Sequence, residues 1–310
     1  MKSIKQTLSF LLIGISIYIM IMFVLSRIKL NNVPLIYQTN DFYIFKGGDT
    51  HTKFLDFNED KGYDVIFVGS SRTYRGYDPE IFEMNGLTTW NLGSGNQTID
   101  ISTQIIKNYI TPQNCKMLMV DLYPLALSGN PIESSSDLIT NISKNSAALD
   151  IAINMKDSRA LNLFVTRICN FDLNPISKAS DYKGKGFCIN QETYPEQYLE
   201  QPSLDSKIGD ISAENLKKLE SLLAYCSKKN INLVLVISPT TKFYTKELLD
   251  VFLSSTKPII DKYNITLLDY SKKLNLNTKD FFYDADHMNY QGVKIFNKKL
   301  IENINIENHE

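Results

Sequence analysis

The sequence predicts an α/β protein: a doubly wound, mostly parallel five-stranded sheet with helices on both faces, preceded by one N-terminal transmembrane helix. Two observations carry this prediction. A charge-free apolar run opens the chain, and five short apolar runs recur further on, separated by helix-length segments. Alternation of strand and helix is typical of parallel sheets whose two faces are both covered by helices.

The N-terminus predicts a membrane anchor. Residues 6–26 carry no charge, and at about 1.5 Å per residue they reach about 31 Å, roughly the thickness of the hydrocarbon core of a bilayer. The alternative is a cleaved signal peptide, but the run is long for one and no A-x-A-like site follows it. Basic residues flank both ends, so charge says little about orientation. We expect the N-terminus inside and the body outside, because short N-terminal anchors usually translocate the long domain that follows.

The remainder divides into a polar juxtamembrane stretch over 31–60 and one domain over 61–310, with residues 1–30 forming the anchor. The expected strands are short apolar runs: 64–69, 88–92, 116–123, 231–238 and 265–270. The expected helices between and after them are 79–82, 99–110, 212–229, 245–262 and 289–304. Residues 125–210 have a weaker pattern, with helices over 145–169 and a loop over 180–206, and we interpret them as an insertion or cap.

Composition excludes several classes of protein. Of the 310 residues, 43% are hydrophobic and only 14 are glycine, so the chain is neither collagen-like nor mostly disordered. A formal charge of −1 makes nucleic acid an unexpected partner. The cysteines form no C-x-x-C pair, which argues against a zinc knuckle. Because an extracytoplasmic body permits disulfides, Cys169 and Cys188 are a candidate pair, whereas Cys115 and Cys226 are expected to be buried thiols.

In a doubly wound sheet the chemistry lies at the carboxyl ends of the strands. Gly69-Ser70-Ser71-Arg72 follows the first strand, and a serine there can point its hydroxyl out of the sheet, as a nucleophile requires. The alternative is ordinary turn and helix-capping chemistry, which Gly-Ser-Ser also suits.

A nucleophilic serine needs a base, and His287 is the candidate. Asp284 precedes it by three residues, so one turn places the carboxylate against the imidazole Nδ1–H and fixes the tautomer. The alternative is that Asp286 or Asn289 caps the final helix and His287 is merely exposed. The other histidines lie in less suitable segments, a charged tail and the juxtamembrane stretch: His309 and His51.

The second strand is followed by Asn91-Leu92-Gly93-Ser94-Gly95-Asn96-Gln97. Small residues leave backbone N–H groups free to converge on a developing oxyanion, and Asn96 adds an amide donor. The alternative is a polar loop that begins a helix.

Together these motifs resemble the SGNH (GDSL-like) hydrolase superfamily over about 64–305, the middle insertion excepted. The resemblance implies that Ser71 is the nucleophile, with Ser70 in the position of the family's aspartate. It also implies that His287 is the base and Asp284 its orienting acid.

The resemblance further implies that Gly93 or Gly95 donates to the oxyanion. The loop is one residue shorter than the family's N-x-G-x-S-G form, so both glycines stay candidates. The family's third block normally supplies a glycine and an oxyanion-hole asparagine after the third strand, but Asp121-Leu122-Tyr123-Pro124 stands there.

Membrane-anchored relatives that move acyl groups onto cell-envelope polymers also vary at the third block. They include DltD-like proteins of lipoteichoic acid D-alanylation and the acetyltransferases of exported polysaccharides. The segment 69–79, Gly-Ser-Ser-Arg-x-Tyr-Arg-Gly-x-Asp-Pro, is most similar to that branch. Arg72 and Arg75 are then candidates to hold an anionic or polyhydroxylated acceptor, the alternative being solvated loop arginines.

The resemblance implies a single-pass membrane esterase or O-acyltransferase that acts on an acylated cell-envelope glycan or polymer through an acyl-enzyme, with no metal or organic cofactor. The alternative is a catalytically weak or inactive scaffold that binds glycan or a multi-spanning membrane acyltransferase, and the missing third-block asparagine favours it. A phosphoryl-transfer enzyme is disfavoured because no G-x-x-x-x-G-K-[ST] loop occurs.

Overall fold

The core of the molecule is one parallel sheet. The computed structural model describes residues 2–30, 33–35, 46–169, 181–207 and 211–307. The five strands lie in the order β4-β3-β5-β8-β9, and all neighbouring pairs are parallel. This order reverses direction at β3, so the predicted doubly wound sheet is confirmed. The strands are β3 (Tyr63–Val68), β4 (Thr89–Asn91), β5 (Cys115–Asp121), β8 (Leu233–Ile237) and β9 (Thr266–Asp269).

Alternate side chains of the strands point to opposite faces, and each face has its own core. Ile66, Leu118 and Leu235 pack on one face against helices α5 (Ile99–Tyr109), α10 (Ala213–Lys228) and α11 (Lys246–Lys262). Val65, Met117 and Val234 pack on the other face against α4 (Pro79–Glu83) and α13 (Tyr290–Glu307). Full burial of one such aliphatic side chain is worth about 1.5–3 kcal/mol, which explains why these runs contain almost no polar residues.

The predicted insertion contains more structure than its weak pattern indicated. Beyond the expected α8 (Asn145–Asn154) and α9 (Ser158–Ile168), it forms two helices that the sequence did not predict, α6 (Pro124–Ser128) and α7 (Ile132–Asn141). A small hairpin, β6 (Tyr182–Gly184) with β7 (Phe187–Cys188), and two 3₁₀ turns, Glu196–Tyr198 and Leu204–Lys207, follow. Two further short helices carry or adjoin the site: α3 (Ser71–Gly76) and α12 (Thr278–Phe281).

The stretch expected to be a polar connector also contains a helix of the body. Helix α2 (Gly48–Asp56) buries Phe54 in the main core, where it lies 5.2 Å from the ring of Tyr109. His51 on this helix lies near the carbonyl of Asn141, with Nδ1 3.3 Å from the oxygen. The described end of the juxtamembrane stretch is therefore packed into the fold. His309 lies outside the described residues.

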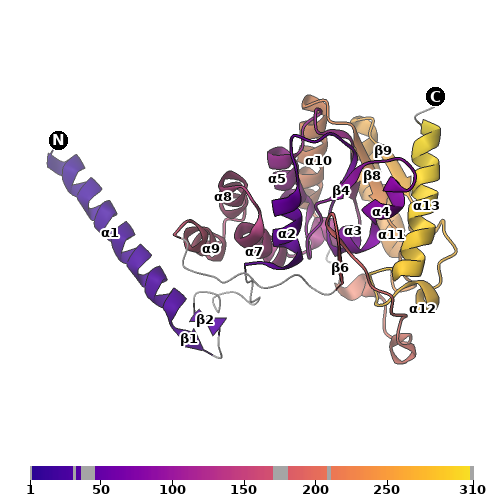
Figure 1. Cartoon of the computed structure of the whole chain (residues 1–310), viewed down its shortest axis with the longest axis horizontal. Helices are drawn as coiled ribbons and strands as arrows, with labels where there is room; N and C mark the ends of the chain where they lie inside the picture. Colours follow the sequence, from indigo (N-terminus) through magenta and orange to yellow (C-terminus); the bar gives the residue numbers. More distant parts are fainter. Residues whose placement is uncertain (1, 31–32, 36–45, 170–180, 208–210, 308–310) are drawn as a thin grey trace.

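The N-terminal helix α1 (Lys2–Arg27) extends away from the sheet and comes closest to α9 (Figure 1). Its segment Ser3–Arg27 is long and apolar enough to cross a membrane, a test that a signal sequence near the N-terminus also passes. The short pair β1 (Lys29–Leu30) and β2 (Val33–Pro34) follows it.

The expected disulfide between Cys169 and Cys188 is wrong, because both thiols are free. Cys188 is buried in the hairpin and its Sγ donates a hydrogen bond to Asp49 Oδ2 at 3.1 Å. Cys115 and Cys226 are buried free thiols, as predicted, and burial raises the pKa of each to about 12.

Candidate active site

A sharp turn places Ser71 at the carboxyl end of β3. Gly69 has φ +154°, and a Cβ there would lie 2.3 Å from Thr73 Oγ1, so only glycine fits. Ser70 is buried and its Oγ accepts a hydrogen bond from the N–H of Arg72 at 3.2 Å, which makes it the N-cap of α3. Ser71, the first residue of the helix, is partly exposed. The two serines therefore have different positions: one caps the helix and the other faces the surface.

The loop before α13 holds His287 in a closed turn. Phe282 and Met288 form an antiparallel bridge at the base of the loop, and the N–H of Tyr283 donates to the carbonyl of His287 at 3.1 Å. Asn289 caps α13 through hydrogen bonds from two backbone N–H groups to its Oδ1. The loop thus presents the imidazole toward the end of β3.

Ser71, His287 and Asp284 are linked by consecutive hydrogen bonds. His287 Nε2 is 2.6 Å from Ser71 Oγ, and His287 Nδ1 is 2.8 Å from Asp284 Oδ2. Oδ1 of the same carboxylate accepts the backbone N–H groups of Asp286 and His287, each at 2.8 Å. With Asp284 ionised, the proton of a neutral imidazole resides on Nδ1, which leaves Nε2 free to accept the serine proton.

The charge on Asp284 is favoured by its surroundings. Burial acts to raise its pKa, but the hydrogen bonds and charge of His287 and the backbone N–H groups outweigh burial, so the pKa lies below its ordinary value. The ring of Tyr283 stacks on the imidazole at 5.5 Å between centroids and 9° between planes. Arg75 in turn lies over Tyr283, with its guanidinium carbon 5.9 Å from the ring centroid.

The loop after β4 distinguishes between the two candidate glycines. The N–H of Gly93 donates to Asn91 Oδ1 at 3.0 Å, so it is not available to an oxyanion. Within the described part of the chain, neither the N–H of Gly95 nor that of Ser71 has a hydrogen-bond partner. Asn96 is exposed, has φ 48°, and donates through Nδ2 to Glu133. Gly95 is therefore the better candidate donor from this loop.

Lys53 contacts the same loop through its buried side chain. The sequence did not predict this contact. Its side chain is 1% exposed, and Nζ donates to the carbonyl of Gly93 at 2.5 Å while lying 4.6 Å from the ring centroid of Tyr74. Burial lowers the pKa of Lys53, against the raising effect of nearby acidic groups. No sequence signal marks this lysine, because it lies in the segment expected to be a connector.

The expectation that Arg72 holds a substrate is wrong. The residue is 3% exposed, and its donors are directed at internal acceptors. Nη1 contacts Asp286 Oδ1 at 2.9 Å, Nε contacts Asp121 Oδ2 at 3.4 Å, and Nη2 contacts the carbonyls of Ser238 and Pro239, each at 3.0 Å. Arg72 therefore joins the strand ends of β5 and β8 to the loop of His287.

This network also explains why an acidic residue ends the third strand. Asp121 is 2% exposed, and its Oδ1 accepts hydrogen bonds from Tyr77 Oη at 2.9 Å and Ser238 Oγ at 2.6 Å. Burial acts to lower the pKa of Arg72, but Asp286 and Asp121 outweigh it and raise the pKa, so the guanidinium stays charged. A carboxylate used in this way supplies no donor to an oxyanion.

Arg75 remains in a position where it can meet a ligand. Its Nη1 pairs with Asp181 Oδ2 at 2.9 Å, and about a fifth of its side chain, 22%, is exposed. The guanidinium also lies 5.2 Å from the ring centroid of Tyr74. This placement beside the histidine loop differs from that of the enclosed Arg72.

A smaller and a larger cleft open at the carboxyl edge of the sheet. The smaller has a volume of about 160 Å³ and is lined by Asn96 from the loop after β4, Tyr123 directly after β5, and Glu133 at the start of α7, among others. The larger, about 590 Å³, lies beyond β8 and β9 and carries four lysines: Lys242, Lys272, Lys273 and Lys279. Neither Ser71 nor His287 is among the residues that line these two clefts.

No protein-family model and no curated protein sequence matches the chain. Solved structures with a similar backbone include an acetyl xylan esterase. It is 14% identical, with a TM-score of 0.42, and the match covers 78% of this chain and 99% of that one. A lipase/acylhydrolase from Enterococcus faecalis is 10% identical with a TM-score of 0.41 over 78% and 95%. A psychrotrophic esterase from Pseudoalteromonas sp. is 10% identical with a TM-score of 0.41 over 80% and 100%.

Proposed function

We propose that this chain is a serine esterase or O-acyltransferase whose nucleophile is Ser71. One observation carries the proposal: the unbroken hydrogen-bond sequence from Ser71 Oγ through both nitrogens of His287 to Asp284. A serine hydroxyl becomes nucleophilic when a base accepts its proton, and a carboxylate on the far nitrogen stabilises the imidazolium that forms. The resemblance of the sequence motifs to SGNH hydrolases agrees with these roles.

The reaction proceeds in two half-reactions. Ser71 Oγ attacks the carbonyl carbon of an ester or thioester while its proton moves to His287 Nε2. The tetrahedral intermediate then collapses, and the leaving alcohol or thiol takes that proton, which leaves the acyl group on Ser71. Water or a sugar hydroxyl attacks the acyl-enzyme in the same manner and returns the serine. Water as acceptor gives an esterase, and a sugar hydroxyl gives a transferase.

The oxyanion requires donors that are unoccupied before the reaction. We assign this role to the backbone N–H groups of Ser71 and Gly95, which come from the ends of neighbouring strands and make no hydrogen bond in the described residues. Two such donors stabilise the charge that develops on the carbonyl oxygen.

We further propose that the protein is anchored by α1 with its body outside the cytoplasm, and that the substrate is an acylated envelope glycan or polymer. The apolar length of α1 and the motif spanning 69–79 support this assignment. Arg75, which is partly exposed beside the histidine loop, is the candidate contact for an anionic or polyhydroxylated acceptor.

Fluorophosphonate labelling of the full chain tests the proposed nucleophile. Wild type and Ser70→Ala should be labelled, and Ser71→Ala should not, since only Ser71 contacts the base. Ser70→Ala is the matched control, because it removes a hydroxyl one residue away that caps a helix. Absence of label on wild type that unfolds cooperatively would contradict the proposal.

A second function, a non-catalytic scaffold that binds glycan or a membrane acyltransferase, is favoured by one observation. The end of the third strand supplies the carboxylate of Asp121, which is occupied by Arg72, Tyr77 and Ser238, in place of an amide donor. The test compares cells that lack the gene with cells that carry Ser71→Ala. If deletion changes the phenotype and Ser71→Ala does not, the scaffold function is supported.

A further inference from the structure

Helix α1 packs on the body along one face near its C-terminal end. Tyr18, Met22, Leu25 and Ser26 recur at the i, i+4, i+7 and i+8 positions, which lie on one side of a helix. Met22 is 3% exposed and Ser26 is 6% exposed, and Leu25 packs against the main core. Most of the rest of α1 is exposed. The contact is therefore specific to this face and to the last third of the helix.

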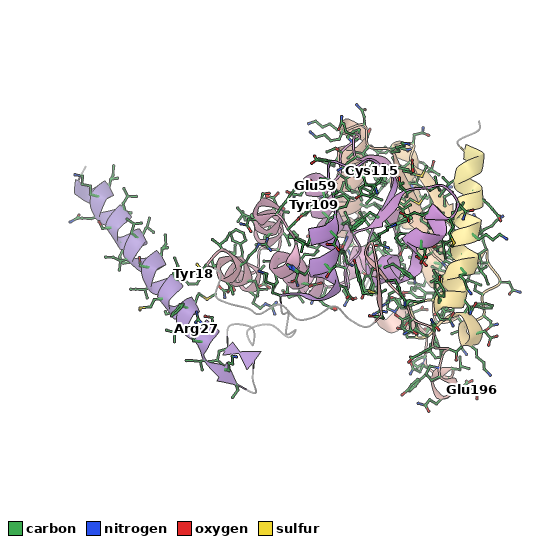
Figure 2. The ribbon with its side chains drawn as sticks, in the orientation of Figure 1. Tyr18, Arg27, Glu59, Tyr109, Cys115 and Glu196 are labelled. Atoms are coloured by element: carbon green, nitrogen blue, oxygen red, sulfur yellow. The ribbon has the colours of Figure 1, made fainter. Side chains whose placement is uncertain are left out.

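The partner of this face is α9. The hydroxyl of Tyr18 donates to Asn162 Oδ1 at 2.6 Å, and Figure 2 shows Tyr18 where α1 approaches the body, well before Arg27 at the end of the helix. Tyr18 and Arg27 are nine positions apart, which corresponds to about 14 Å along the helix axis. If residues 6–26 span the hydrocarbon core, this contact lies well inside one leaflet, whose thickness is about 15 Å.

Helices α8 and α9 present large apolar side chains to their surroundings beside this contact. Ile153 on α8 is 57% exposed, and Leu161 and Ile168 on α9 are 45% and 50% exposed. Leu149 on α8, one turn before Ile153, is also exposed. Gathered apolar groups of this size are uncommon on a surface that faces only water, and they mark an interaction site.

Several charged side chains of these helices have partners within the protein. Asp157 pairs with Arg159 at the start of α9, and Arg167 donates to the carbonyls of Ile139 and Ile142 on the body side. Asp150 accepts a hydrogen bond from Asn108 of α5. Lys156, in the turn between the helices, has a long side chain that can reach the headgroup level.

We infer that α8 and α9 lie in the lipid surface, with Leu149, Ile153, Leu161 and Ile168 in contact with the acyl chains of the leaflet from which the Arg27 end of α1 emerges. The inference rests on the proposed membrane anchoring and deepens it, since it holds the body against the bilayer instead of on a free tether. We assign lipid as the binding partner of these apolar side chains because they lie next to α1, a helix that is itself apolar enough to cross a membrane.

Depth-dependent fluorescence on the full chain in phospholipid vesicles tests this inference. Cys169→Ser removes the partly exposed native thiol, and single cysteines at Ile153, Leu161 or Ile168 then carry an environment-sensitive dye. Val251 and Ile295, which are 58% and 43% exposed on α11 and α13, are matched controls, and Ile13 on α1 is the internal reference. All these positions are at the surface, so the variants should fold.

We expect dye at Leu161 and Ile168 to emit at shorter wavelength than dye at Val251, and to be quenched by nitroxide-labelled lipids as dye at Ile13 is. Quenching at Ile13 together with aqueous emission at Leu161 and Ile168 would overturn the inference. Aqueous emission at Ile13 as well would overturn it together with the anchor. Neither result bears on the catalytic proposal, which fluorophosphonate labelling tests separately.

Discussion

Arg72 and Asp286 form a partly buried ion pair, with Nη1 2.9 Å from Oδ1, between the residue directly after Ser71 and the residue directly before His287. The ion pair thus links the neighbours of the proposed nucleophile and the proposed base. Arg72 also lies between the rings of Tyr123 and Tyr244, at 4.8 and 5.6 Å from their centroids. The pair holds the two segments in position and is distinct from the groups proposed to react.

Arg72→Met should destabilise the protein and lower kcat. Removing the guanidinium leaves the carboxylates of Asp121 and Asp286 without their partner, a type of change that costs about 3–5 kcal/mol in buried pairs. Denaturant unfolding gives the free energy, and ester hydrolysis gives kcat. Lys246→Ala, which breaks the exposed pair with Asp250, is the control and should change little. An Arg72→Met protein as stable as wild type would contradict the positioning role.

Gly95→Pro should lower kcat by about 10²–10³, the usual effect of losing one oxyanion donor, because proline has no N–H. Gly95→Ala is the matched control. Its Cβ would lie 2.9 Å from Glu133 Oε1, a flexible side-chain end that can move away, and the N–H is kept. Equal kcat values for the proline and alanine variants would exclude Gly95 as a donor.

The stability that Asp284 contributes should depend on pH in one direction. Its folded-state pKa lies below the ordinary value of 3.8, so the ionised form is favoured by folding. The difference in unfolding free energy between wild type and Asp284→Asn should therefore be constant at pH values above the ordinary pKa. It should shrink as the pH falls from the ordinary pKa through the lowered, folded-state pKa. Chemical denaturation across the acid range measures it. A difference that grows toward acid would contradict the assigned hydrogen bonds.

The stability of wild type relative to a Lys53 variant should also rise with pH, in this case in the alkaline range. Burial lowers its pKa from 10.5, so the unfolded chain binds more protons than the folded one between the two values. Wild type should gain stability relative to Lys53→Met as the pH rises through that interval. Unfolding free energies of both proteins at several alkaline pH values test this, with Lys228→Met on the exposed end of α10 as control. Parallel curves for wild type and Lys53→Met would show that the lysine is not buried as described.

The sheet and the serine–histidine contact could be predicted because they follow from local rules. Each buried strand is a short apolar run, and the carboxyl ends of parallel strands share one edge, so Ser71 and His287 meet across 216 positions of sequence. The spacing of Asp284 and His287 is a single turn, and a single turn needs no tertiary information.

The buried polar network could not be predicted in the same way. Arg72 and Asp286 are 214 positions apart, and both residue types are common on surfaces, so nothing local marks them as partners. Likewise, α7 carries three successive serines, Ser134–Ser136, that are buried in the fold, although serine runs suit turns equally well. The disulfide expectation failed because proximity in an irregular stretch does not fix the geometry that a bridge requires.

The position of α2 sets where the body can be separated from its N-terminal helix. Phe54 is 1% exposed in the main core and Lys53 donates a hydrogen bond to the carbonyl of Gly93, so this segment is part of the folded unit that carries Ser71 and His287. A truncated form that begins at residue 61 would lose both a core aromatic ring and the lysine that contacts the loop after β4. A truncated form that begins at Lys46 retains both.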